Sequence, residues 1–407
     1  MTAQRLRNFT SEQPEQRAAL ERFRALGWPD RKTEAWHFSY SALRAIGRTE
    51  YETVTVYPPP VQEVRRWPML ENSWEVLFVN GRYVGSIKCP EGVSLSMESF
   101  PVSNTFDSLP FAALAEGIAA EAITLTLHGV VVPPIHICWV TQPGGSPLVF
   151  APRLRLVLAA GAQATLLESF VGEAGEATLA TPVCEITLGE GAILDHGVLQ
   201  DEALTASHIS ATSVTVARKA QYRSFRLSVG AALGRADVRV VLDGPEASAH
   251  VDGAYTAGSG QHLDATILVD HGAPRCTSHQ TWKAVLDGSA RGVFQGRIHV
   301  RQGANGTDGN QVHKALLLSP QARVDAKPEL TVLADDVACA HGAASGALDE
   351  DALFYLQARG LDGDTARSLL IEGFLDDVLS GIASDPIRAV FQARVATWLK
   401  ARKERMQ

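Results

Sequence analysis

The chain has 407 residues, of which 45% are hydrophobic, so it is long enough to bury a large core and to hold two or three structural units. Its formal net charge of -8 at pH 7 argues against nucleic-acid binding, because phosphate-binding surfaces concentrate positive charge. The N-terminus lacks the apolar core of a signal peptide, and no run of about 18 apolar residues occurs that could cross a bilayer, so we expect a soluble, cytoplasmic protein that contacts no membrane.

The N-terminal part is expected to form a helical and mixed domain over residues 1–120, acting as a cap or docking unit. A helical pattern occupies residues 11–48, and Gly-Trp-Pro at 27–29 interrupts it, so a second helical segment runs from Thr33 to Ile46. The apolar stripe of the first segment comprises Leu20, Phe23 and Leu26.

A proline-rich break at residues 57–60 separates these helices from a compositionally mixed region. Residues 74–79 predict a strand there, and Asn80-Gly81 directly after it predicts a tight turn.

Residues 121–346 predict a β core. Short alternating runs such as 154–158, 236–242 and 296–300 follow one another with almost no helical period between them. A small or polar turn followed by alanine and a strand recurs at Ala164, Ala192, Ala220, Ala247, Ala290 and Ala322, with spacings of 28, 28, 27, 43 and 32 residues. Such a period favours a solenoid of stacked β-coils over a sandwich or barrel, in which turns recur every ~8–12 residues.

The C-terminal residues 347–407 predict a small helical domain. Acidic residues at 349–351 introduce a helix that Gly360 ends, a second helix runs from Asp364 to Ile382, and Ser384-Asp385-Pro386 begins a third. The apolar side of these helices either packs onto the end of the solenoid or docks another protein.

Cys339 and His341 stand two residues apart in the strand-like stretch 327–346, so they should share one face. A thiol beside an imidazole suits iron, zinc or an iron–sulfur species, although a lone cysteine more often packs as a small hydrophobe. The chain's five cysteines lie far apart and include no C-x-x-C pair, which excludes a disulfide framework and a zinc knuckle. Any metal here would therefore need ligands from another chain.

Several motifs resemble the SufB/SufD family of the SUF iron–sulfur cluster assembly system. They occur in the family's order and spacing at residues 310–319, 324–330, 334–343 and 353–360. The resemblance is dense over residues 262–375 and weaker over 150–260, and residues 31–39 look like a segment near the start of the SufD branch.

The resemblance implies a mainly β fold, with a right-handed parallel β-helix between N-terminal and C-terminal helical regions. It further implies a non-catalytic scaffold that pairs with SufB and binds the ATPase SufC through its C-terminal helices. A cluster would form transiently at the SufB interface, with no cofactor held tightly by the isolated chain. Because the sequence lacks a G-x-x-x-x-G-K-[ST] loop, ATP hydrolysis would come from the partner.

The family's D-D-V-x-C-x-H-G motif falls on Asp335, Asp336, Val337, Cys339, His341 and Gly342, with Ala338 where a lysine is usual. His341 would be the family's functional histidine, facing a SufB cysteine across the interface, whereas Cys339 is either a ligand or core packing. Lys327 and Pro328 belong to a neighbouring structural motif. The residues expected to dock the ATPase are Leu353, Phe354, Tyr355, Leu356, Arg359, Leu369 and Phe374.

Other histidines in the same region should have structural roles, as hydrogen-bonding groups of a polar ladder inside the solenoid. They are His262 with Asp264, His271, His279 and His313, with Cys276 nearby.

Two alternatives remain open. The chain could be a SufB-like main scaffold that binds a cluster alone, or a β-helix enzyme that cleaves polysaccharide. The latter needs paired carboxylates or a calcium site on one face, usually in a secreted protein, whereas the adjacent Asp335 and Asp336 should lie on opposite faces of a strand and we find no export signal. Unpaired strand edges would also allow the isolated chain to form a homodimer.

Overall fold

The computed structural model describes residues 6, 9–54, 70–86, 89–97 and 104–406. The predicted proline-rich break at 57–60 lies outside the described residues. None of the described helices is both long and apolar enough to cross a membrane.

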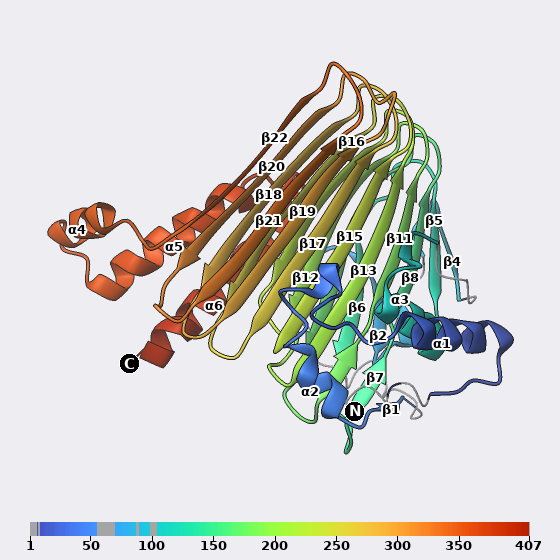
Figure 1. Ribbon diagram of the computed structural model, residues 1–407, viewed down its shortest axis with the longest axis horizontal. Helices are drawn as coiled ribbons and strands as arrows, with labels where there is room; N and C mark the ends of the chain where they lie inside the picture. Colours follow the sequence, from blue (N-terminus) through green and yellow to red (C-terminus); the bar gives the residue numbers. More distant parts are fainter. Residues whose placement is uncertain (1–5, 7–8, 55–69, 87–88, 98–103, 407) are drawn as a thin grey trace.

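Two long sheets face each other across a shared core, and the chain passes alternately from one to the other (Figure 1). The first sheet contains, in spatial order, β21 (Arg323–Val332), β19 (Arg291–Val300), β17 (His262–His271), β15 (Leu233–Leu242), β13 (Ala206–Val216), β11 (Val183–Leu188), β8 (Arg153–Leu158), β5 (Ile123–Leu127) and β4 (Val93–Ser96). Its side branch contains β1 (Glu52–Thr53), β7 (Leu148–Phe150) and β10 (Thr178–Ala180). The second sheet contains β22 (Ala338–Gly346), β20 (Asp308–Leu317), β18 (Thr277–Leu286), β16 (Ser248–Ala257), β14 (Gln221–Ser228), β12 (Ile193–Asp201), β9 (Gln163–Gly172), β6 (Ile135–Thr141), β2 (Trp74–Val79) and β3 (Arg82–Ser86).

Neighbouring strands from β5 to β22 pair in parallel, as in β17 with β19 and β18 with β20. The predicted parallel β-helix is therefore confirmed, and the sandwich and barrel alternatives are wrong. Its interior is lined by apolar residues that stack in register from one strand of a sheet to the next. We call each such strand level a rung. One such buried column in the first sheet is Ile186, Val214, Val240, Val269 and Ile298.

The corner that leads into the second sheet repeats every 27–31 residues, as the strand starts at Gln163, Ile193, Gln221, Ser248, Thr277, Asp308 and Ala338 show. Two residues before each start, the backbone takes a positive φ, at Gly161, Gly191, Lys219, Glu246, Arg275, Gly306 and Asp336. The predicted alanine series mixes two corners. Ala290 and Ala322 precede strands of the first sheet, which explains the spacing of 43, and Ala164 lies inside β9.

N-terminal helices cover the outer face of the first sheet (Figure 1). They are α1 (Pro14–Leu26), the 3-10 turns η2 (Glu34–Trp36) and η4 (Asn104–Phe106), α2 (Leu43–Arg48) and α3 (Pro110–Ile118). The prediction of one helix from Thr33 to Ile46 is wrong, because this segment turns so that Trp36 and Ser39 reach the buried face against the sheet. Leu26 is 40% exposed and lies outside the buried stripe of α1, which is Ala19, Leu20 and Phe23.

The predicted strand at 74–79 is confirmed as β2, which extends the second sheet beside β6. Asn80 and Gly81 form the predicted turn with φ values of 49° and 76°, conformations that asparagine and glycine adopt most readily.

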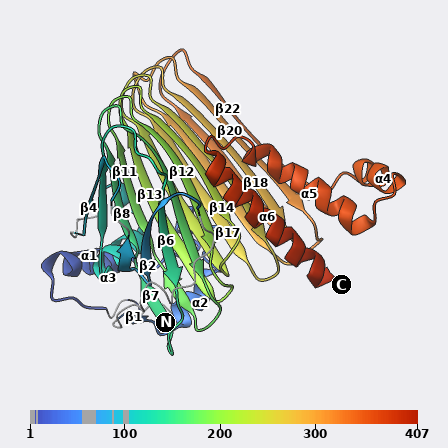
Figure 2. The same ribbon diagram turned by 180° about the vertical axis from the view of Figure 1, so that it is seen from behind.

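C-terminal helices α5 (Gly363–Leu379) and α6 (Asp385–Met406) lie across the second sheet, whereas α4 (Glu350–Ala358) extends away from the strands (Figure 2). Asp349 caps α4 by accepting hydrogen bonds from the backbone N–H groups of Asp351 and Ala352, and Gly360 follows with a φ of 95°, as predicted. The second predicted helix ends at Leu379 rather than at Ile382.

Within the described residues, β21 and β22 each pair with a single strand, so their outer edges are unpaired. We call this pair of edges the open end. At the opposite end of the described strands, the antiparallel β3 and β4 finish the sheets.

Candidate functional site

Cys339 and His341 lie on β22, at the open end. Their register partners on β20 are Gly309 and Gln311. Gly309 and Gln311 are buried in the interior of the solenoid, and a Cβ added to Gly309 would lie 3.4 Å from Cys339 Sγ. Cys339 and His341 therefore share the inward face, as their spacing predicts, and His341 is exposed because no described strand covers β22.

The backbone of His341 also faces the free edge. The N–H of Ala338 donates to Thr307 O on the preceding rung (2.8 Å), and the register from Ala338 to Gly346 contains no shift. In such a regular ladder alternate residues point to opposite sides. Even-numbered residues of β22 therefore bond to β20, whereas Cys339, His341, Ala343 and Ser345 present their backbone groups outward.

The same alternation explains Pro328. The N–H groups of Arg323 and Leu333 donate toward β19, so odd-numbered residues of β21 face β19 and Pro328 faces the free edge. Proline, which lacks an N–H, is tolerated there because no ladder bond is lost. Nζ of its neighbour Lys327 lies 2.8 Å from Oε1 of Glu34, and this ion pair raises the pKa of Lys327.

Cys339 is half-buried in a small apolar cluster formed by Ile298, Val300 and Ala304, with Leu330, Ala334 and Val337 packed against it. Burial raises the pKa of its thiol. Cys339 therefore packs in the apolar interior while its side chain lies next to that of His341. This placement is compatible with both roles predicted for Cys339, a metal ligand and a packing residue.

Asp335 and Asp336 lie in the turn between β21 and β22, so the expectation that they occupy opposite faces of a strand is wrong. Asp336 has a φ of 54°, and its backbone carbonyl accepts a hydrogen bond from the Gly306 N–H (2.8 Å), which joins consecutive corners. Gly342 lies in β22, and a Cβ there would meet no atom within 4 Å. These motif residues shape the last corner and strand.

Among the described residues, no three or more His, Cys, Asp and Glu side chains gather closely enough to hold a metal ion. Cys339 and His341 together would supply two ligands, so a tetrahedral site at the open end would need others from outside this chain.

The histidines singled out in the sequence are mostly buried with partners. His271 Nε2 lies 2.8 Å from Ser278 Oγ, and His313 Nε2 lies 2.9 Å from Tyr255 OH. His262 and Asp264 do not line the interior, because both contact Ser39 of the N-terminal layer, on the outer face of the first sheet.

A polar cluster inside the solenoid was not predicted from the sequence. Glu168 accepts a hydrogen bond from Trp139 Nε1 (3.0 Å) and lies 3.1 Å from His196 Nε2, whose other ring nitrogen contacts Tyr222 OH. Burial works to raise the pKa of Glu168, but the contacts with His196 and Trp139 lower it below its ordinary value. The sequence feature that could have indicated this cluster is a glutamate and a histidine that recur on the inward face of two successive strands, β9 and β12.

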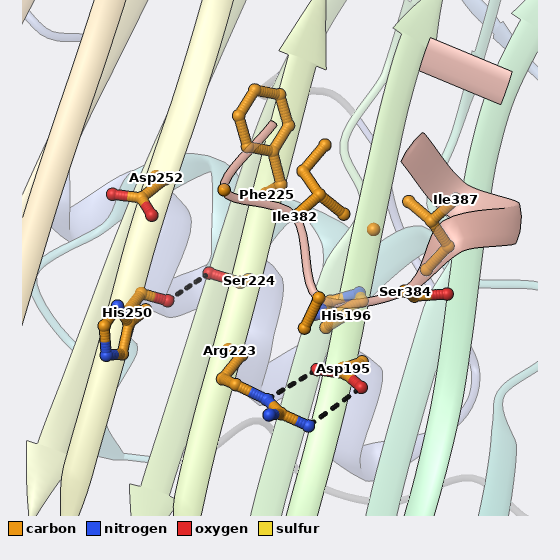
Figure 3. A pocket seen from close by; sticks show the side chains of 13 residues that line it. Asp195, His196, Arg223, Ser224, Phe225, His250, Asp252, Ile382, Ser384 and Ile387 are labelled. Carbon is orange, nitrogen blue, oxygen red and sulfur yellow. Dashed lines mark hydrogen bonds and ion pairs between the residues drawn. The ribbon is translucent and has the colours of Figure 1, made fainter. Parts of the chain in front are cut away.

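A pocket of about 130 Å³ lies beside the turn between α5 and α6 (Figure 3). Arg223 pairs with Asp195 at 2.7 Å, while Ile382 and Ile387 close the apolar side. Burial raises the pKa of Asp252, which also lines the pocket, to about 7. No sequence pattern indicates this pocket, because its residues come together only through the register of successive strands and the turn between the two helices.

The predicted docking residues of the C-terminal helices differ in exposure. Phe354 and Tyr355 on α4 are 72% and 58% exposed, and Leu369 on α5 is also exposed. Leu353 is buried, and Phe374 lies under the ammonium of Lys283 at 4.5 Å. The remaining two are Leu356, which is half-buried, and Arg359, whose guanidinium lies 5.2 Å from the Tyr355 ring centre.

Comparisons with known proteins agree on one family. The SufBD core domain of SUF system FeS cluster assembly matches residues 140–374. The chain is 30% identical to Protein ABCI7, chloroplastic, of Arabidopsis thaliana, over 95% of this chain and 87% of that protein. It is 26% identical to the iron-sulfur cluster assembly protein SufD of Escherichia coli, over 95% of this chain and 93% of that protein. A SufBD family protein of Synechocystis, slr0076, is 33% identical over 61% of this chain and 57% of that protein.

Proposed function

The chain belongs to the SufBD family of SUF iron–sulfur cluster assembly proteins, as a SufD homologue, and we propose that it is the scaffold subunit that pairs with SufB through the open end. The family match begins well before the densest motifs, at residue 140. The nascent cluster, which is cargo rather than a resident cofactor, would form where His341 meets the partner.

The observation that carries this proposal is the coincidence of an unpaired strand edge with His341. Unpaired backbone N–H and C=O groups are a template for another strand, and natural proteins usually cover or blunt them. Here four residues of β22 present backbone groups outward while the imidazole of His341 remains exposed. A partner strand added at this edge would bring its own side chains beside the imidazole.

The second part of the proposal is that α4 docks the ATPase SufC. Phe354 and Tyr355 are exposed aromatic side chains at consecutive positions of a helix that extends away from the solenoid. Large exposed apolar side chains gathered in one place mark interaction surfaces. ATP hydrolysis would occur on SufC, and this chain would act without catalytic turnover of its own.

Movement of α4 could reach the solenoid through α5 and α6, which are fixed to the second sheet and its corners. Lys283 on β18 lies 2.5 Å from Asp377 of α5, Arg394 of α6 pairs with Asp201 at 2.5 Å, and Arg402 of α6 pairs with Asp287 at 2.7 Å. We propose that SufC, by binding one arrangement of these helices better than another, shifts the solenoid and opens the partner interface.

The experiment that tests the pairing uses two substitutions at one position of the free edge. Ala343→Pro removes an outward N–H without removing a ladder bond to β20, whereas Ala343→Val keeps that N–H. We expect co-expressed SufB to be recovered with the wild type and Ala343→Val and lost with Ala343→Pro, at equal thermal stability of the isolated chains. Recovery of SufB with a folded Ala343→Pro chain would contradict pairing through this edge.

A further inference from the structure

Directly beneath His341 lies a column of buried amide side chains. Gln311 on β20 is the register partner of His341, and Gln280 on β18 is the register partner of Gln311. Adjacent strands in a sheet are about 4.8 Å apart, so equivalent side chains on successive rungs are nearest neighbours. Two glutamines and one histidine therefore occupy one inward-facing position on three consecutive rungs.

Both amides are buried without hydrogen-bond partners in the described part of the chain. Gln280 and Gln311 are each 1% exposed, and neither the nitrogen nor the oxygen of either amide has a partner. A buried amide left without hydrogen bonds destabilises the folded state, because it has lost its bonds to water without replacing them. An apolar residue at either position would avoid that cost, so the two amides point to a role in hydrogen bonding to ordered water or to His341.

The amide of Gln311 reaches the opposite sheet. Its Nε2 occupies the space beside Gly296 of β19, where a Cβ would lie 1.6 Å from that nitrogen. The side chain therefore crosses the interior at the level of the last complete rung. His341 occupies the equivalent inward-facing position on β22, the next strand toward the open end.

We propose that Gln311 is a positioning residue for His341. After a small reorientation of the amide, or through one water, its oxygen would accept a hydrogen bond from one ring nitrogen of His341, and this would leave the other ring nitrogen unprotonated toward the open end. A histidine that binds a metal usually donates its second ring N–H in this way, because that bond fixes the tautomer and the ring orientation. The importance of this bond for cluster assembly rests on the proposed function of His341.

The test is the tautomer of His341, measured from ring 15N chemical shifts in the full-length isolated chain, with the resonance assigned by its loss in His341→Gln. The wild type should show one dominant tautomer, and Gln311→Met should show a mixture of both. Gly296→Ala, which displaces the amide without removing it, should shift the populations in the same direction. Asn310→Ala is the control, because Asn310 is the neighbour that bonds to Asp308 and faces away from the interior.

We expect Gln311→Met to fold as the wild type does, since it removes two buried polar atoms without hydrogen bonds and preserves the side-chain volume. Identical ring shifts in the wild type and Gln311→Met would overturn the proposal. In the SufB complex, we expect Gln311→Met to slow cluster formation by about 10–100-fold. If the tautomer changes while both Gln311→Met and His341→Ala assemble clusters normally, the positioning stands and the proposed role of His341 fails.

Discussion

The guanidinium carbon of Arg235 lies 4.2 Å from the centre of the Trp36 ring, at the junction of the N-terminal layer and the solenoid. Arg235 is fully buried and pairs with Asp237 at 2.9 Å and with Asp264 at 2.5 Å. Burial opposes its charge, but the two carboxylates raise its pKa above the ordinary value. Trp36 thus covers a buried ion cluster that links β15 to β17.

Trp36→Ala should detach this layer. Truncation of a fully buried tryptophan costs about 3–5 kcal/mol, and here it also opens the Arg235 cluster to water. We expect limited proteolysis to cleave within residues 34–48 before any cut in the solenoid. The exposed neighbour His37 provides the control, and equal protease resistance in Trp36→Ala and His37→Ala would argue against this role.

Acid should destabilise the protein through buried histidines. Burial lowers the pKa values of His262, His271 and His313 to about 4, below an unfolded value of about 6.5. The unfolded chain therefore binds more protons between these values. Stability present above pH 6.5 is lost as the pH falls toward 4, by up to about 1.4 kcal/mol per pH unit for each histidine.

Urea unfolding at pH 7.5 and pH 5 measures this effect. His271→Gln should reduce the difference between the two free energies of unfolding, whereas His37→Gln should leave it unchanged. A wild type that is equally stable at both pH values would show that these histidines are protonated without penalty.

Cys339 should react slowly with iodoacetamide near neutral pH. The thiolate is the reactive form, and burial raises the pKa of this thiol above its ordinary value. We expect its alkylation rate, followed by peptide mass spectrometry, to keep rising beyond pH 9. A rate that is already maximal at pH 7 would instead identify an activated thiolate and favour a ligand role.

Substitutions on the exposed side of α4 should abolish SufC binding without lowering the stability of the chain. Phe354→Asp with Tyr355→Asp should abolish SufC binding while the melting temperature stays within about 1–2 °C, because both side chains are exposed. Leu353→Asp is the structural comparison, since that side chain is buried and its replacement should lower the melting temperature. SufC binding by the double variant would place the docking surface elsewhere.

Deletion of residues 349–407 is a poorer test of docking. It would uncover the apolar outer face of the second sheet, which α5 and α6 cover through residues such as Ile371, Leu375 and Phe391. We expect that deletion to aggregate, which static light scattering would detect, whereas removal of α4 alone should leave a monodisperse chain.

The β-helix was predictable because its strands, turns and long period are local features. Its register was harder to predict, since four of the seven left-handed corner positions are occupied by Lys219, Glu246, Arg275 and Asp336 rather than by glycine. Without a uniform turn residue, alanines from opposite corners looked like one series.

The motif around Cys339 and His341 indicated the correct strand and face. What it could not indicate was the column beneath His341, because Gln311 and Gln280 become its neighbours only through register across about 30 residues per coil. The turn at Trp36 was missed for a similar reason, since its partner Arg235 lies about 200 residues away and overrides the local helical pattern.

The most direct test of the central claim is the native mass of the complex recovered when this chain is co-expressed with SufB and SufC of its own organism. The account predicts one assembly that contains all three proteins, from which SufB is lost with Ala343→Pro and SufC with the double α4 variant. Recovery of this chain alone, as a monomer or a homodimer, while SufB and SufC associate without it, would contradict the proposed role.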